Sequence, residues 1–292
     1  MRFVPVLLFC ALMLAACSDA FDPFVESDRT FALYGFLDAR QDTQYVRVQA
    51  ITEQEEPGST VAARVTSTDL VTEETIAWQD SLVRLDDGEL GTAFFAVFRP
   101  EAGRTYRIEA MRPDDPGAAS EVVVMLPAEP PLQTAEPEVI GGAVAQRLTL
   151  PGDLRPENVR VTYTVQRVEV GSDPIGFSFE RNAQPVVGGG AFDVLVPLSR
   201  DAQVIRSTLG IDPQDPEPVA LLSLQLSYEI LDEQRAEVTG GIGNVGAAAA
   251  FETEWTLAEA FVEAIGFVDA QGSEQSPPAA QRAMRYHPSL AR

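Results

Sequence analysis

The chain has 292 residues, with 44 acidic against 21 basic side chains and a formal net charge of −23. It contains no lysine. This balance argues against nucleic acid and anionic lipid surfaces as partners, because both need clustered cations. The single histidine, His287, lies in the C-terminal tail, and the two cysteines are Cys10 and Cys17. A histidine-based catalytic triad or a thiolate metal site is therefore not expected in the body of the chain.

The acidic bias has two open explanations. A halophilic host would favour a dense carboxylate surface, because salt screens the repulsion between its charges. A GC-rich genome with an ordinary solubilising surface would produce the same composition. Both explanations place the charge on the surface.

Residues 1–16 have the composition of a secretory signal peptide. Arg2 supplies a positive end, and residues 3–14 form an apolar stretch that small residues close. This stretch is shorter than the roughly 20 residues that a membrane-spanning helix needs. Leu14-Ala15-Ala16-Cys17 resembles the lipobox of bacterial lipoproteins, which implies cleavage before the cysteine and its acylation. The alternative is an ordinary cleaved signal with a chance cysteine near the cut.

Cys17 is the one residue to which the sequence assigns a definite chemical role, as the lipid attachment site. Durable anchoring takes two or more acyl chains, at about 0.8 kcal/mol for each buried CH₂ group. Cys10 would be removed with the signal peptide. Once Cys17 is acylated, the mature chain therefore has no free thiol for a disulfide or a nucleophile. Residues 17–27 are predicted to be a tether. In the bacterial lipoproteins that this motif resembles, a serine after the cysteine, here Ser18, favours sorting to the outer membrane, on either its periplasmic or its surface face.

Residues 28–127 are predicted to form an immunoglobulin-like antiparallel sandwich. Short apolar or alternating segments, separated by turn sequences, lie at residues 30–37, 44–50, 61–66, 75–78, 92–98, 105–111 and 121–126. About seven short strands without a long helical pattern are typical of this fold. The cysteine–tryptophan–cysteine signature of antibody domains is absent.

A proline-rich acidic segment, 128–138, is predicted to be a stiff linker to a second domain. Residues 139–269 are predicted to be a β-rich domain with one or two short helices. Its expected strands are 144–150, 159–165, 191–196 and 222–230. Ser199 is expected to cap a helix over residues 200–209. A capping box that begins at Thr256 is expected to start a second helix, which ends at Gly266. Residues 270–292 are predicted to be disordered.

Three patterns have both a functional and a structural interpretation. The glycines of 241–246 fit G-x-G-x-x-G, but the expected strand–glycine–helix order is missing, which favours a flexible loop over a dinucleotide site. The acidic turns 86–89 and 114–115 have oxygen ligands for Ca²⁺ but no EF-hand spacing, which favours hairpin turns. Trp78 and Trp255 are expected in the core rather than stacked on a sugar. No catalytic, cofactor-binding or metal-ligating residue is assigned.

The order of several motifs resembles an uncharacterised family of Bacteroidota-type outer-membrane lipoproteins. After the lipobox come Phe21-Asp22-Pro23-Phe24, Tyr34-Gly35-Phe36-Leu37-Asp38, Asp42-Thr43-Gln44-Tyr45-Val46-Arg47-Val48, Gly103-Arg104-Thr105-Tyr106 and the glycines of 240–246. The resemblance covers residues 17–268. Such proteins are often encoded beside TonB-dependent outer-membrane receptors, which implies an accessory role in nutrient capture, and the family supplies no catalytic residues.

The sequence thus predicts a lipid-anchored, non-catalytic binding or accessory protein of the cell envelope, without a cofactor. Its expected partners are the membrane, through the anchor, and a TonB-dependent receptor, and its ligand is not specified. One alternative is a structural envelope lipoprotein with no ligand. Another is a polysaccharide hydrolase that uses two carboxylates, which would need to lie about 5–9.5 Å apart in a cleft.

Overall fold

The computed structural model describes residues 29–51, 60–84, 90–169, 171–211 and 218–269. Within these residues the chain is mainly β, with several sheets and two short helices. No helix among them is long and apolar enough to cross a membrane. The mainly β, sandwich-like fold class that the sequence predicts is confirmed.

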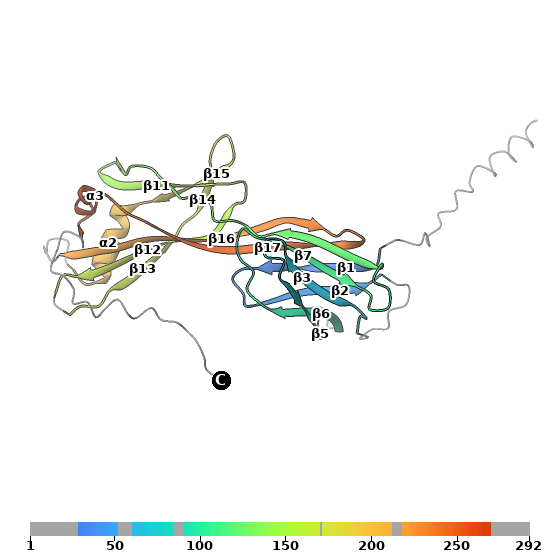
Figure 1. The fold of residues 1–292 in the computed structure, drawn as a ribbon. Helices are drawn as coiled ribbons and strands as arrows, with labels where there is room; N and C mark the ends of the chain where they lie inside the picture. The colour runs from blue at the N-terminus through green and yellow to red at the C-terminus, as the bar shows by residue number, and fades with distance from the viewer. Residues whose placement is uncertain (1–28, 52–59, 85–89, 170, 212–217, 270–292) are drawn as a thin grey trace, which may run out of the picture.

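A nine-stranded sheet runs the length of the described part of the chain (Figure 1). Its strands, in spatial order, are β13 (Ile175–Glu180), β12 (Pro156–Arg167), β16 (Val219–Glu237), β17 (Gly241–Trp255), β1 (Phe31–Asp38), β2 (Thr43–Ala50), β6 (Leu90–Val97) and β5 (Gln79–Arg84). The short strand β18 (Val268–Asp269) pairs in parallel with β16. All the other pairs in this sheet are antiparallel except β1 with β17, which run in the same direction.

A four-stranded sheet covers one face of the large sheet and forms the first lobe with it. Its order is β4 (Thr75–Ala77), β3 (Arg64–Asp69), β7 (Thr105–Met111) and β8 (Ala119–Met125). Alternate residues of both sheets meet in one buried apolar core, to which β1, β2, β6, β7, β8 and β17 all contribute. The period-2 alternation of each strand places every second side chain in this core.

The second lobe packs a five-stranded sheet and both helices against the same face of the large sheet. The smaller sheet contains β9 (Gln133–Thr134), β10 (Glu138–Ile140), β11 (Ala143–Pro151), β14 (Ala183–Pro185) and β15 (Ala191–Val196). The helices are α2 (Leu198–Thr208) and α3 (Glu259–Ala264). Together with β12, β16 and the end of β17 they enclose a second apolar core.

Strand β17 belongs to both lobes. Val245 and Ala247 lie in the first core, and Ala249 and Phe251 lie in the second. Figure 1 shows β16 and β17 passing from one lobe to the other. The division into domains at 28–127 and 139–269 stays a prediction, but the first lobe includes a strand from residues 241–255, which pairs with β1.

The predicted glycine loop at 241–246 is wrong, because these residues are the first half of β17. Glycine is needed there for close approach to β1. A Cβ at Gly241 would lie 2.3 Å from the carbonyl oxygen of Phe31, and one at Gly243 would lie 2.1 Å from that of Leu33. The pattern therefore supports a strand pairing and forms no strand–loop–helix unit for a dinucleotide.

Both predicted helix caps are also wrong. Helix α2 has Pro197 at its N-cap, and the Ser199 hydroxyl accepts a hydrogen bond from the Val144 N–H (2.8 Å) instead. Helix α3 begins after Ala258 without a side-chain cap. The predicted linker 128–138 is partly structured, because β9 pairs with β11.

Candidate functional site: a pocket between the lobes

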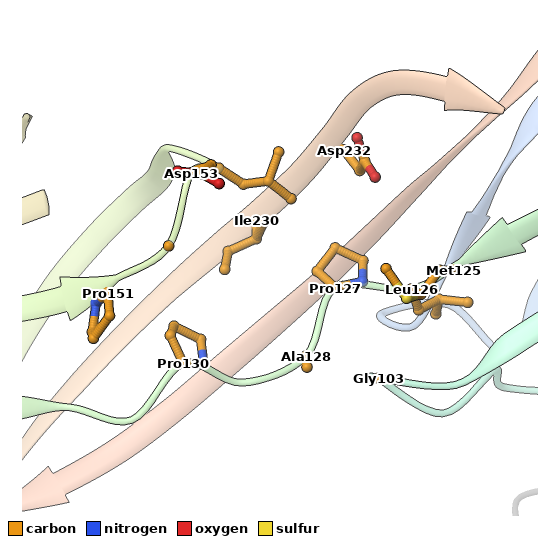
Figure 2. Close-up of a pocket in the computed structure, with 12 residues that line it drawn as sticks. Gly103, Met125, Leu126, Pro127, Ala128, Pro130, Pro151, Asp153, Ile230 and Asp232 are labelled. Carbon is orange, nitrogen blue, oxygen red and sulfur yellow. The ribbon is translucent and has the colours of Figure 1, made fainter. Parts of the chain in front are cut away.

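A pocket of about 220 Å³ lies where the two lobes meet (Figure 2). Four separate parts of the chain line it: Gly103 before β7, the end of β8 with the segment after it, the turn between β11 and β12, and the middle of β16. The lining residues are Gly103, Met125, Leu126, Pro127, Ala128, Pro130, Pro151, Gly152, Asp153, Leu154, Ile230 and Asp232.

The walls of this junction pocket extend directly from the two apolar cores. Leu126, at 1% exposure, belongs to the first core, and Ile230, at 5%, belongs to the second. The backbone holds the first wall, because Gly103 N–H donates to the Pro127 carbonyl (3.0 Å) and Leu126 N–H donates to the Arg104 carbonyl (2.9 Å). A pocket built on two packed cores is largely preformed.

The chemistry of the junction pocket is apolar with an acidic rim. Pro127, Pro130 and Pro151 line it, and proline offers no N–H donor, so these parts of the wall present hydrocarbon and carbonyl oxygens. Asp153 is exposed in the turn between β11 and β12, and Asp232 is partly buried on β16 and engaged by a neighbour. This arrangement suits an apolar group that carries a positive charge or hydrogen-bond donors.

The segment after β8 is held against the second lobe beside the pocket. The Thr253 hydroxyl donates to a Glu129 carboxylate oxygen (2.6 Å), and the Gln146 side-chain amide donates to the Ala135 carbonyl (2.9 Å). Burial, with the charge of Glu129, raises the pKa of Tyr228 to about 12, against a smaller opposing effect of Thr253. This tyrosine therefore stays neutral at physiological pH.

A buried polar group ties α2 to the large sheet in the second lobe. The Tyr163 hydroxyl donates to Asp201 (2.8 Å), and the Arg181 guanidinium pairs with the same carboxylate. Burial, followed by the charge of Asp201 and the hydrogen bond to it, raises the pKa of Tyr163 well above its ordinary value. Arg181 also lies over the ring of Phe179, 5.2 Å from its centroid. The arrangement is a buried network that joins α2 to the sheet.

A second, more polar pocket in the first lobe has a volume of about 180 Å³. At its centre Arg104 pairs with Asp69 (2.9 Å) and Glu101 (2.6 Å). Burial alone would raise the pKa of Asp69, but the hydrogen bonds from Arg104 and from the Val71 N–H bring it below its ordinary value. Asp69 also accepts from the Thr72 N–H (3.3 Å), so its carboxylate organises the turn after β3.

The two tryptophans are core residues, as predicted, each 7% exposed. Trp78 donates through its indole N–H to the Ser67 hydroxyl and Trp255 donates to the Gln146 carbonyl oxygen, both at 2.9 Å. The rings thus pack with satisfied donors and are not platforms for a sugar.

The other predicted functional residues are placed as follows. Cys17, His287 and the acidic turn 86–89 lie outside the described residues. Asp115 accepts from the Gly117 N–H (3.1 Å) in a tight turn, which confirms the hairpin interpretation of 114–115. Over the described ranges, no group of three or more His, Cys, Asp or Glu is arranged to hold a metal ion. Sequence reasoning missed the junction pocket, although proline clusters at 127–131 and Pro151-Gly152 mark two of its walls.

No family model and no curated protein matches the chain. Among solved structures, it is similar to the C-terminal globular domain of an oligosaccharyltransferase from Pyrococcus abyssi, with 10% sequence identity and a TM-score of 0.18 over 78% of this chain. The chain covers about half, 49%, of that structure's length. A TM-score of this size carries no argument about fold or function.

Proposed function

We propose that this protein is a lipid-anchored, non-catalytic binding or accessory protein of the outer membrane, which accepts its ligand in the junction pocket. The observation that carries the proposal is the preformed apolar pocket with carboxylates at its rim. The lipobox motif at Cys17 supports the location, and the resemblance to outer-membrane lipoproteins supports a partnership with a TonB-dependent receptor in nutrient capture.

The volume of the pocket limits the size of the ligand that it can hold. Drug-sized ligands occupy cavities of about 300–1,000 Å³. The junction pocket, at about 220 Å³, therefore takes a small molecule or one side chain of a peptide. Its acidic rim favours a cationic head, and its proline walls favour an aliphatic stem. Arginine or lysine side chains of a peptide combine both properties.

The anchor is tested by fractionating cells that express the full chain or its Cys17→Ser variant. We expect the natural chain in the membrane fraction and the variant in the soluble fraction, because the variant has no thiol to acylate. Release of the natural chain from the membrane by high salt would contradict the anchor, since salt does not extract an acylated protein from a bilayer.

The pocket is tested by thermal shift of the full chain with N-acetyl-arginine amide, N-acetyl-lysine amide and N-acetyl-norleucine amide. A ligand at about 100 times its Kd adds about 2.7 kcal/mol to the folded state. We expect the two cationic amides to raise Tm more than norleucine, and Asp153→Asn to reduce that difference. Asp173→Asn is the matched control, because Asp173 is an exposed acid that does not line the pocket. Equal shifts for all three amides, or equal effects of the two variants, would reject a cationic ligand.

A further inference from the structure

One face of the nine-stranded sheet carries a cluster of exposed aromatic and aliphatic side chains in the first lobe. This aromatic face consists of the exposed side chains Tyr34, Phe36, Tyr45, Val97 and Ile242 and the half-buried Phe95, on β1, β2, β6 and β17. Val97 is 74% exposed, Tyr45 57%, Tyr34 41% and Phe36 39%. Contiguous exposed apolar surface on a soluble domain marks a place where something else binds.

The strand register puts these side chains on the face opposite the core. Phe36 lies beside Tyr45, and Tyr45 lies beside Phe95, on three neighbouring strands. The rings of Tyr45 and Phe95 are 6.2 Å apart between centroids. On the other side of Phe36 is Gly246, where a Cβ would come within 2.4–2.9 Å of three atoms of the Phe36 ring. The glycine lets this ring lie across the sheet.

The same face of the sheet is polar in the second lobe. There the Thr162 and Ser178 hydroxyls bond across the strands (2.8 Å), and Gln225 donates to Glu252 (3.3 Å). Polar cross-strand pairs of this kind are typical of a solvent-exposed sheet face. The apolar part of this sheet face is therefore confined to the first lobe.

The charge of the aromatic face differs from that of the protein as a whole. At the outward positions of β1, β2, β5, β6 and residues 241–248 of β17 the one carboxylate is Asp38, which pairs with Arg40 (2.7 Å), and the other charged residue is Arg47. Glu237 of β16 lies at the edge of this face, beside Asn244. In a chain of net charge −23, this face can approach a phospholipid headgroup layer without bringing a dense acidic surface with it.

The predicted attachment site, Cys17, lies close in sequence to β1, which is one of the strands of this face. From Cys17 to Phe31, where β1 begins, 14 residue steps span at most about 50 Å. A tether of this length makes docking intramolecular, with an effective concentration of order millimolar. A surface with low affinity for the bilayer is therefore sufficient. Tyrosine and other aromatic rings favour the membrane–water interface.

We propose that the aromatic face rests on the bilayer that holds the lipid anchor, so that the first lobe lies against the membrane and the junction pocket is held at a set distance from it. This inference depends on the proposed acylation of Cys17. The contact is made by aromatic rings rather than clustered cations, so neutral phosphatidylcholine supports it and anionic lipid weakens it.

The test uses the full lipoprotein, acylated in cells and reconstituted in phosphatidylcholine vesicles that contain brominated acyl chains. Because no other cysteine remains in the mature chain, Val97→Cys can carry a single bimane label. Ser178→Cys, exposed on the polar part of the same sheet face, is the matched reporter. We expect brominated lipid to quench the label at position 97 at least about twofold more than the label at 178, as for side chains inserted at the interface.

A second substitution tests the surface itself. Tyr45→Glu should bring the label at position 97 to the low quenching of the reporter at 178. Leu195→Glu, at a 54% exposed position of β15, should leave it unchanged. Circular dichroism confirms that both variants fold.

The outcomes separate this inference from the lipid anchor. Failure of the protein to float with the vesicles would reject the anchor and this inference together. Flotation with equal, weak quenching at both labels would reject the docking alone. Protection of the label at 97 in native outer membranes but not in vesicles would also reject it, because another envelope component would then cover the face.

Discussion

Replacing Gly243 by alanine tests whether the parallel pairing of β1 with β17 holds the first lobe together. Gly243 has a φ of +108°, and it pairs with Leu33. An added Cβ would lie 2.1 Å from the Leu33 carbonyl oxygen, where real contacts stay above 3.0 Å. The two strands would therefore have to separate by about 0.9 Å, the difference between these distances. Gly188 has the same φ of +108° with nothing within 4 Å, so Gly188→Ala is the matched control.

The magnitude follows from two contributions. The left-handed backbone costs about 1–3 kcal/mol for a residue with a side chain, and this cost is common to both variants. Separation of the strands at Gly243 also weakens the hydrogen bonds on either side of it, each worth about 1 kcal/mol net. We therefore expect Gly243→Ala to lower the free energy of unfolding by about 2 kcal/mol more than Gly188→Ala does. For a protein of this size, that difference lowers Tm by about 4–8 °C relative to the control.

Urea unfolding followed by tryptophan fluorescence measures the difference. Trp78 reports on the first core and Trp255 on the second, so single Trp→Phe variants separate the two signals. Because β17 is shared, we expect the loss at Gly243 to move both transitions. Equal losses in the Gly243 and Gly188 variants would refute the reasoning, since the backbone conformation alone would then account for them.

Three further predictions concern the titrating groups. Tyr163→Phe removes a buried hydrogen bond to Asp201 (2.8 Å) and should lower the free energy of unfolding by about 1–3 kcal/mol, as urea titration at pH 7 measures. The pKa of Tyr163 is raised in the folded state, so stability should fall as the pH rises above about 10, where only the unfolded chain loses this proton. The fall should be shallower in Tyr163→Phe than in Tyr45→Phe, whose ring is exposed, and equal slopes would contradict the assignment. Burial alone would raise the pKa of Asp38, but hydrogen bonds from Arg40 lower it below its ordinary value, so its stabilisation is lost as the pH falls below about 4. Arg40→Met should make the loss of stability between pH 5 and pH 3 smaller, and an unchanged loss would show that the pair contributes nothing.

Local sequence was sufficient where each strand has its own alternating pattern. The bounds of the strands 105–111 and 191–196 were predicted to the residue. Alternation with a period of two places side chains in a core, and it can be recognised from consecutive residues alone. The burial of both tryptophans followed from the apolar segments around them. The lipid attachment at Cys17 stays a prediction, since it lies outside the described residues.

Features that depend on contacts between distant segments could not be predicted in this way. The glycines of 241–246 look like a flexible loop until β1, more than 200 residues earlier, is placed beside them. Edge strands such as β5 and β13 have weak patterns, because much of their length is exposed. The junction pocket needs four separate segments, and its walls near Leu126 and Ile230 are apolar positions like any other in the sequence.

By itself, the sequence determined the acidic, lysine-free composition, the β character of the chain and a cysteine chemistry confined to Cys10 and Cys17. Only the tertiary structure decided that one sheet joins both lobes, that a pocket forms between them and that aromatic side chains gather on one outward face. The physical reason is that alternation shows which side chains share a face of a strand. Register between strands far apart in the chain decides which faces meet, and which remain open to a ligand or a membrane.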